Sequence, residues 1–444
     1  MIIPPARRTS SVKEYYFSLK NREIAALNAD RAARGLDPVI NLGVGSPDGA
    51  PPDEAVEALC RCARNPRNHG YQAYTGLPEL REAMADWYRT WYGVTLDPSS
   101  EIQPLMGSKE GILLLSLAFL NPGDGVLVPN PGYPTYTSAA RLCEARIVPY
   151  DLVEADGWYP DFEALEKLDL AGVKIMWTNY PNMPTGAPAR EDIFEKLVDF
   201  ARRHGILLVN DNPYSFILNE PRSLLSVPGA REFCLEMNSL SKSHNMAGWR
   251  MGMMVGAADV IRELLKVKTQ MDSGMFRGIQ EAAVEALRAP SAWYESLGAE
   301  YRRRQGVARR IMDSLGCTYD PAAGGLYVWG RVPCAKTAPG AHGAAKKDFP
   351  CAKTAPGAHG AAEKDLPCAK TAPGAHGVAV PGGSPAEAWS DRILYGAGVF
   401  LTPGFIFGSG GENHLRISLC ADVPTLERAL EKIAFFINAG ESDV

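Results

Sequence analysis

Apolar runs of strand length alternate with helical patterns through the middle of this 444-residue chain, and this alternation constrains the fold more than any other feature. The strand-like runs cover residues 102–106, 125–128, 146–150, 173–177, 206–210, 233–238 and 251–255, with helical patterns such as residues 191–203 between most of them. Strands that alternate with helices form a mostly parallel sheet covered by helices. The sequence therefore predicts an α/β fold around a mostly parallel, seven-stranded sheet.

The alternation ends at a long helical pattern over residues 293–315, which predicts a helix that leads out of a large domain of about residues 50–295. Beyond it, strand patterns at 325–331 and 414–419 and a helical pattern at 426–437 predict a smaller α/β domain over residues 296–444. With 444 residues, the chain is long enough for two such domains and a large core.

A repeated segment interrupts the smaller domain. The sequence Pro-Cys-Ala-Lys-Thr-Ala-Pro-Gly-Ala-His-Gly begins at Pro333, Pro350 and Pro367. Pro, Gly, Ala and Lys dominate it, which is typical of a disordered surface loop, so we expect a low-complexity insertion over residues 333–383. Its cysteines and histidines could instead bind a metal, but their spacing matches no zinc pattern, and the sequence predicts no metal site.

The segment Ser239-Leu240-Ser241-Lys242, with Arg250 eight residues after the lysine, suits an aldehyde cofactor that carries a phosphate. A lysine amine can form a Schiff base with the aldehyde. The hydroxyls and the planar guanidinium can bind the phosphate. The alternative is a solvated surface lysine, as most lysines are.

Two further segments favour the cofactor. Residues 107–111 (Gly-Ser-Lys-Glu-Gly) follow one apolar run and open a helical pattern, which makes either an anion site at a helix N-terminus or an ordinary turn. Asp211 ends another run, at the edge where open α/β sheets bind ligands, and its carboxylate can keep a pyridine nitrogen protonated. A turn would also explain Asp211, but it leaves Tyr214 without a role.

Two more segments concern the substrate side of such a site. Residues 179–186 contain two prolines and a glycine, which predict a rigid loop after a strand. Arg416 lies between apolar neighbours on an alternating run, so its guanidinium needs a partner if it is buried. That partner is either a substrate carboxylate or an internal carboxylate.

These motifs together resemble the class I/II aminotransferases of the pyridoxal-phosphate fold-type-I superfamily, and most closely their LL-diaminopimelate aminotransferase-like branch. The resemblance runs from about residue 15 to the C-terminus, apart from the repeat. Its segments, in order, are residues 41–45, Tyr71 with Gly76, 80–81, 107–109, 131–134, 184–186, Asp211 with Tyr214, 239–242, 248–252 and Arg416. It implies that residues 1–49 belong to the small domain.

The resemblance also implies a role for each matching residue. The catalytic residues would be Lys242, which carries the cofactor and a proton, with Asp211 and Tyr214. Pyridoxal 5'-phosphate would be bound by Ser108, Lys109, Tyr133, Asn182, Asp211, Tyr214, Ser239, Ser241, Lys242 and Arg250, and by Tyr71 from the other subunit of a homodimer. Gly45 and Arg416 would bind the substrate.

One position departs from the family pattern. The family usually has an asparagine directly before Pro-Thr-Gly as a second ligand of the ring hydroxyl, and this chain has Met183 there. Asn182 or Asn179 would replace that asparagine, or Tyr214 would act alone.

The predicted function is transfer of an amino group between an L-amino acid and a 2-oxo acid. A lyase or decarboxylase on the same fold is the alternative, because a fold does not choose its reaction. Arg416 favours transamination, since it retains the carboxylate. A non-catalytic, ligand-sensing regulator would carry a DNA-binding domain before residue 41, and no basic stripe is present there.

Composition agrees with a small-molecule enzyme. Lys and Arg number 46 against 51 Asp and Glu, a net charge of −5, which does not suit a nucleic-acid-binding protein. No apolar stretch approaches the roughly 20 residues of a membrane span, and no secretory signal is recognisable. The nine cysteines show no zinc pairing, so we expect reduced thiols and a cytoplasmic protein.

The substrate side chain is the least defined part of the prediction. Tyr15, Tyr16 and Phe17 form either an aromatic lid over the side-chain pocket or part of the packing of the domain. Arg277 either meets a distal carboxylate or is an exposed charge.

Overall fold

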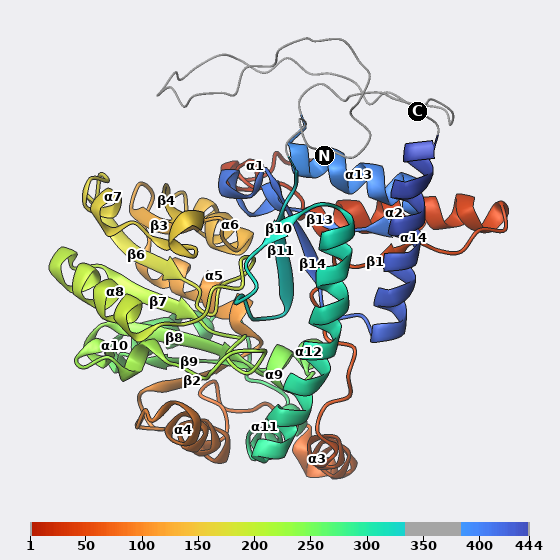
Figure 1. Ribbon diagram of the computed structural model, residues 1–444. Coiled ribbons are helices and arrows are strands. Elements are labelled where there is room, and N and C mark those ends of the chain that lie inside the picture. The colour runs from red at the N-terminus through yellow and green to blue at the C-terminus, as the bar shows by residue number, and fades with distance from the viewer. Residues whose placement is uncertain (1, 334–382, 443–444) are drawn as a thin grey trace.

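The computed structural model describes residues 2–333 and 383–442, and its centre is an eight-stranded sheet (Figure 1). The sheet order is β2-β9-β8-β7-β6-β3-β4-β5. The strands are β2 (Ile102–Leu105), β3 (Gly125–Asn130), β4 (Arg146–Val153), β5 (Tyr159–Pro160), β6 (Val173–Thr178), β7 (Leu207–Asp211), β8 (Cys234–Ser239) and β9 (Gly252–Gly256). The predicted α/β fold is confirmed: β3, β4, β6, β7 and β8 run parallel to one another. β9 is antiparallel to its neighbours β8 and β2, and β5 pairs antiparallel with β4 at the other edge.

All seven predicted runs form strands, shifted by a few residues at most. The eighth strand, β5, has only two residues and pairs with the C-terminal end of β4. It is too short to show an alternating pattern in the sequence.

Helices cover both faces of this sheet because its strands are apolar on both faces. On β3, Val126 and Val128 belong to one buried cluster and Leu127 to another, as the two-residue period of a strand requires. The first face packs against α5 (Ser108–Phe119), α6 (Pro134–Leu142) and α10 (Ala258–Lys268). The other packs against α4 (Pro78–Tyr92), α8 (Glu191–His204) and α11 (Arg277–Leu287), with α3 (Asp53–Arg64) against α11 and the short α7 (Phe162–Glu166) nearby.

The long helix α12 (Ser291–Ser314) leads from the end of α11 to a second, antiparallel sheet (Figure 1). That sheet has the order β10-β11-β14-β13. Its strands are β10 (Thr318–Tyr319), β11 (Tyr327–Arg331), β13 (Thr402–Pro403) and β14 (His414–Ser418). α13 (Pro385–Ala397) packs against β13 and β14, and α14 (Val423–Ser442) packs against α12 and α13.

The N-terminal segment lies against this second part of the molecule. It contains α1 (Arg7–Ser10), α2 (Tyr16–Ala33) and β1 (Ile40–Asn41), and β1 pairs in parallel with β12 (Val399–Phe400). Leu42 continues the pairing, because its N–H donates to the Phe400 carbonyl. The chain directly after β1 is therefore held beside the second sheet, where residues 43–46 reach the pocket described below.

Most of the repeat, residues 334–382, lies outside the described residues, as do the cysteines and histidines considered as metal ligands. Among the helices that are described, none is long and apolar enough to cross a membrane.

Candidate active site

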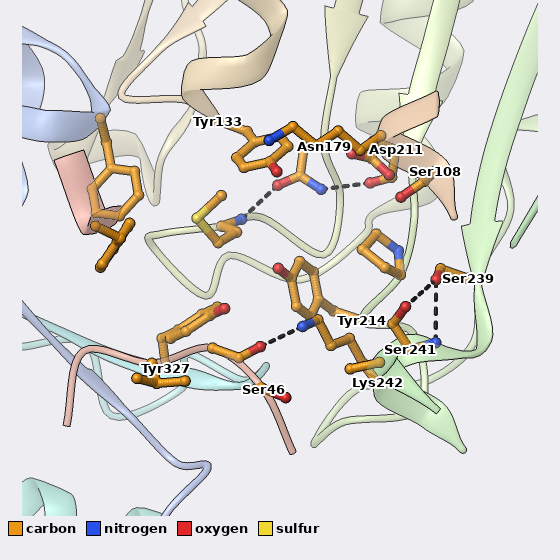
Figure 2. Close-up of a pocket in the computed structure, with 18 of the residues that line it drawn as sticks. Ser46, Ser108, Tyr133, Asn179, Asp211, Tyr214, Ser239, Ser241, Lys242 and Tyr327 are labelled. Atoms are coloured by element: carbon orange, nitrogen blue, oxygen red, sulfur yellow. Dashed lines mark hydrogen bonds between the residues drawn. The ribbon is translucent and has the colours of Figure 1, made fainter. Parts of the chain in front are cut away.

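A pocket opens where the carboxyl ends of the parallel strands face the second sheet (Figure 2). This is the edge at which open α/β sheets bind ligands. The residues predicted from the sequence that line it are Gly45, Ser108, Lys109, Tyr133, Asp211, Tyr214, Ser239, Ser241, Lys242, Arg250 and Arg416. Asn182 and Tyr71 do not line it.

Lys242 lies on α9 (Leu240–Ser243), a single turn that directly follows β8. The Ser239 side chain caps this turn: its Oγ accepts a hydrogen bond from the Ser241 N–H at 3.2 Å. The ammonium of Lys242 donates to the Gly45 carbonyl across the pocket (Figure 2). Burial lowers the pKa of Lys242, and the nearby guanidinium of Arg416 lowers it further. A lysine in this setting loses its proton more readily and becomes a nucleophile.

Asp211 ends β7 and is 4 % exposed. Its Oδ2 accepts a hydrogen bond of 2.9 Å from the Tyr136 hydroxyl, and its Oδ1 is buried without a partner. Burial raises the pKa of Asp211 to about 7, while the bond from Tyr136 acts in the opposite direction. A buried carboxylate oxygen without a donor costs free energy until a hydrogen-bond donor binds beside it.

Of the two candidate replacements for the missing asparagine, Asn179 lines the pocket. Its amide donates to the Asp211 carbonyl and accepts a bond of 2.7 Å from the Met183 N–H (Figure 2). The other candidate, Asn182, does not line the pocket, and its side chain bonds within its own loop. Its amide donates to the Asn179 carbonyl, and its oxygen accepts from the Thr185 hydroxyl.

The anion end of the pocket is built around two glycines. Gly107 has a φ of 83° and precedes α5, and a Cβ on it would overlap the Arg250 guanidinium. A Cβ on Gly252 would meet the N–H of Ser108 at 3.0 Å. Without these Cβ atoms, the first turn of α5 can approach Arg250 closely. Burial, and then the charge of Arg250, lower the pKa of Lys109 beside them. The uncompensated positive charge and the free N–H groups of α5 suit a phosphate.

Arg416 is 3 % exposed on β14 and has no carboxylate partner among the residues that the structure describes. One guanidinium N–H donates to the Gly43 carbonyl at 3.0 Å and another to the Met183 sulfur at 3.5 Å, while Nε has no partner. The guanidinium carbon lies 4.0 Å from the centre of the Tyr327 ring and 4.8 Å from that of Phe407. A buried guanidinium without a carboxylate partner is a site for a carboxylate from a ligand.

The aromatic residues 15–17 near the N-terminus fall into two groups: two of them fit the predicted lid, and one fits the predicted packing of the domain. Tyr15 and Phe17 line the pocket, as the lid reading requires. Tyr16 instead packs edge-on against Phe405, with ring centres 5.6 Å apart. Sequence reasoning overlooked Asn21, which also lines the pocket. Its position one helical turn after Phe17 was the available signal, because residues i and i+4 share a helix face.

Tyr136, Tyr327 and Phe407 are among the other pocket residues that the sequence did not predict. Tyr136 carries a sequence signal, since it is on the helix that follows Tyr133, three residues further on. Tyr327 and Phe407 carry none, because only the fold of the second sheet brings them beside Arg416.

Two predicted residues lie elsewhere. Tyr71 is 92 % exposed on a loop between α3 and α4. Arg277 is outside the pocket and pairs with Glu281 one turn along α11, at 2.6 Å, so the exposed-charge reading describes it.

The geometry can be compared with known proteins. Residues 37–433 match the family model for aminotransferase class I and II. The LL-diaminopimelate aminotransferase of Oleidesulfovibrio alaskensis is 36% identical over 433 residues, which cover 97% of this chain and 98% of that protein. Substrate-bound BacF from Bacillus subtilis superposes with a TM-score of 0.80 at 32% identity, covering 98% of both chains.

A further solved structure, a probable N-succinyldiaminopimelate aminotransferase from Thermus thermophilus, has a TM-score of 0.76 at 30% identity, covering 93% of this chain and 98% of that one. The chain therefore belongs to the class I and II aminotransferase family, whose members depend in general on pyridoxal phosphate. It is an enzyme that transfers an amino group between an amino acid and a 2-oxo acid, and the lyase and regulator alternatives are set aside.

Proposed function

We propose that this aminotransferase binds pyridoxal 5'-phosphate in the pocket at the ends of β7 and β8, and that Lys242, Asp211 and Arg416 carry out the reaction. One observation supports this above all: three polar groups that await a ligand share one pocket. They are the Lys242 amine with its lowered pKa, the unpartnered Oδ1 of Asp211, and the guanidinium of Arg416 without a carboxylate.

The residues that line the pocket match each part of the cofactor: its phosphate, its ring nitrogen, its ring hydroxyl and a face of its ring. Ser108, Ser239, Ser241 and Arg250 offer hydroxyls and a guanidinium for the phosphate, and Lys109 adds positive charge. Asp211 Oδ1 is an acceptor for a protonated ring nitrogen. Tyr214 and Asn179 would take the ring hydroxyl, and Tyr133 would cover one face of the ring. When bound, the cofactor supplies an electron sink for negative charge at the substrate Cα.

The protein groups then position the substrate and move one proton. Arg416 binds the α-carboxylate and so fixes the direction of the Cα–H bond. Lys242, released from the cofactor, takes the proton from Cα as a general base. With one water molecule consumed, the amino acid would leave as a 2-oxo acid and its amino group would stay on the bound cofactor. A second 2-oxo acid would take up that group, with release of one water molecule, when the steps reverse.

Borohydride reduction tests the role of Lys242. We expect reduction of the loaded enzyme to attach the cofactor irreversibly to Lys242, located by peptide mapping. Lys242→Ala should keep cofactor through the phosphate contacts, yet show no amino transfer. Lys266→Ala, an exposed lysine on α10, is the matched control and should behave as the wild type. A label on any lysine other than Lys242 contradicts the assignment.

We also propose a homodimer in which Tyr71 contacts the cofactor site of the partner. Exposed apolar side chains gather near it: Tyr71, Tyr74, Met106, Met271 and Phe276. The segments that carry them are neighbours, because Gln103 donates to the Tyr74 carbonyl and a Cβ on Gly274 would meet the backbone of Gln72. An apolar patch of this kind is typical of a subunit interface.

Subunit mixing tests the dimer. Tyr71→Ala and Lys242→Ala are each expected to be weakly active or inactive alone. After exchange of subunits, the mixed dimer has one site with both residues intact, so activity should return to about a quarter of the wild-type value. A monomer in sedimentation velocity, or no recovery on mixing although heterodimers form, would contradict the proposal.

A further inference from the structure

Residues 43–47, here called the strap, form neither helix nor strand, yet two of their carbonyls meet side chains of the pocket. The Gly43 carbonyl accepts a bond of 3.0 Å from Arg416, and the Gly45 carbonyl accepts one from Lys242 (Figure 2). Irregular backbone lacks the regular hydrogen bonds that fix a helix or a strand. The position of the strap therefore depends on the contacts at its two ends.

The two ends of the strap are attached in different ways. Before it, the Leu42 carbonyl accepts a bond of 2.8 Å from the N–H of Ser418, the last residue of β14. After it, Asp48 Oδ1 accepts a bond of 2.6 Å from the guanidinium of Arg304, which lies on α12. The first attachment joins two backbone groups, whereas the second depends on two side chains.

The guanidinium of Arg304 joins the strap to the strand that carries Arg416. Its side chain is 9% exposed, and its Nη1 donates both to Asp48 and to the Leu419 carbonyl, the latter at 3.1 Å. Leu419 directly follows β14. The Nε of Arg304 donates to Glu300, one turn earlier on α12, at 2.8 Å. Because the guanidinium is planar, this bond fixes the direction in which Nη1 points.

We propose that Arg304 is a positioning residue for the substrate carboxylate: it holds the strap against β14 and so keeps the Gly43 carbonyl and the Arg416 guanidinium in place. The inference rests on the proposed function, because it takes Arg416 as the α-carboxylate site. Arg304 does not line the pocket, and it bonds to none of the proposed cofactor ligands. Its loss should therefore weaken substrate binding and spare cofactor binding.

The test measures these two affinities separately. The substrate probe is 2-aminoisobutyrate, which has an α-carboxylate and an α-amino group but carries methyl groups at both remaining positions of Cα. Without a Cα–H bond it can bind to the loaded enzyme and lose no proton. It has no long side chain, so its affinity does not depend on which side chains the enzyme prefers. The cofactor absorbance reports its binding, and titration of the cofactor-free protein gives the cofactor affinity.

In Arg304→Met, the dissociation constant of the probe should rise at least ~10-fold, because the carboxylate site loses its pre-arranged geometry. The dissociation constant of the cofactor should stay unchanged. Asp48→Asn should give a smaller rise, and the double variant should lose no more than Arg304→Met alone, since both changes remove one attachment. Arg304→Lys keeps a cation for Asp48 and should recover part of the affinity.

Arg310→Met is the matched control. Arg310 lies on the same helix, its side chain is 58% exposed, and it pairs with Glu427 on the surface at 2.6 Å. This variant should change neither dissociation constant. Asp48→Asn provides the same two measurements if Arg304→Met does not fold.

An unchanged probe affinity in Arg304→Met and Asp48→Asn overturns the inference and leaves the proposed function intact. An equal loss of cofactor and probe affinity also overturns it, because Arg304 would then support the fold as a whole. The variant Arg416→Met distinguishes a failure of the proposed function. If it binds the probe as tightly as the wild type, Arg416 is not the carboxylate site, and the proposed function and the inference are both wrong.

Discussion

Asp211 shows how one buried residue links the site to the stability of the protein. Burial raises its pKa to about 7 from the ordinary 3.8, because the charged form loses its water. The neighbouring carboxyl of Glu236 adds to the increase. A carboxyl whose folded pKa is raised contributes stability that is complete below its unfolded pKa and is lost as pH rises through its folded pKa.

We therefore expect the cofactor-free protein to lose roughly 3 kcal/mol of unfolding free energy from this group between pH 5 and pH 8, at 1.4 kcal/mol per pH unit up to pH 7. Urea denaturation at a series of pH values measures it. In Asp211→Asn, the part of the pH dependence of the unfolding free energy that comes from residue 211 should vanish. An identical slope in the variant and the wild type would mean that Asp211 is ionised throughout.

The same experiment on Tyr136→Phe separates the effect of the hydrogen bond on the pKa of Asp211 from the effect of burial. The hydroxyl of Tyr136 donates to Asp211 Oδ2, which favours the charged form and lowers the pKa of Asp211. Its removal should raise that pKa further and move the loss of stability to higher pH. A shift to lower pH would contradict the assigned direction.

At the scale of elements, a buried ion cluster holds the first turn of α5 in place. The anion site depends on this turn. The ammonium of Lys268, at the end of α10, pairs with Glu110 at 3.1 Å and with Asp272, and its side chain is 1% exposed. Glu110 in turn accepts a 2.6 Å bond from the Met106 N–H, just before Gly107. The cluster therefore connects α10 with the turn between β2 and α5.

Lys268→Met removes the one cation and leaves two buried carboxylates together. We expect a loss of about 3–5 kcal/mol of unfolding free energy and weaker cofactor binding, because the turn before α5 loses its support. Urea denaturation and cofactor titration measure the two effects. Lys266→Met is the control, since Lys266 pairs with Glu263 on the surface and should cost no more than about 1 kcal/mol. Equal effects in both variants would refute the role of the cluster.

At the scale of the whole molecule, the repeat is inserted between two anchored ends. The Val332 N–H donates to the Asn413 carbonyl at 2.8 Å, and the Ser384 hydroxyl caps α13 by accepting from the Glu387 N–H. The second sheet and α13 are thus fixed by contacts outside residues 334–382.

Replacing residues 334–382 with a short Gly/Ser linker should leave turnover unchanged. The melting temperature should stay the same or rise slightly, since each halving of a flexible connection saves about 0.6 kcal/mol of closure entropy. Amino-transfer assays and calorimetry on both proteins measure this. Loss of activity, or stoichiometric zinc in the wild type that disappears with the repeat, would revive the metal-binding reading of its Cys and His residues.

The local sequence was sufficient for the parts of this protein that depend on local order. Strands alternating with helices identified the α/β sheet, because the period of apolar residues follows backbone geometry. Lys242, Asp211 and the turn at Gly107 were predictable as pocket residues, because each lies at or just beyond the end of a predicted strand, and parallel strands end at one edge.

Tertiary structure decided what depends on contacts between distant segments. That Asn179 lines the pocket and Asn182 does not follows from the path of one loop, in which the Asn182 side chain bonds to the Asn179 carbonyl and to Thr185. Phe17, Tyr327 and Phe407 surround Arg416 only because α2 and the second sheet close over the ends of the large sheet. The sequence pattern does not predict these contacts, since packing between side chains far apart in the chain leaves no local periodicity. The sequence alone thus determined the reaction, and the tertiary structure determined which side chains line the pocket.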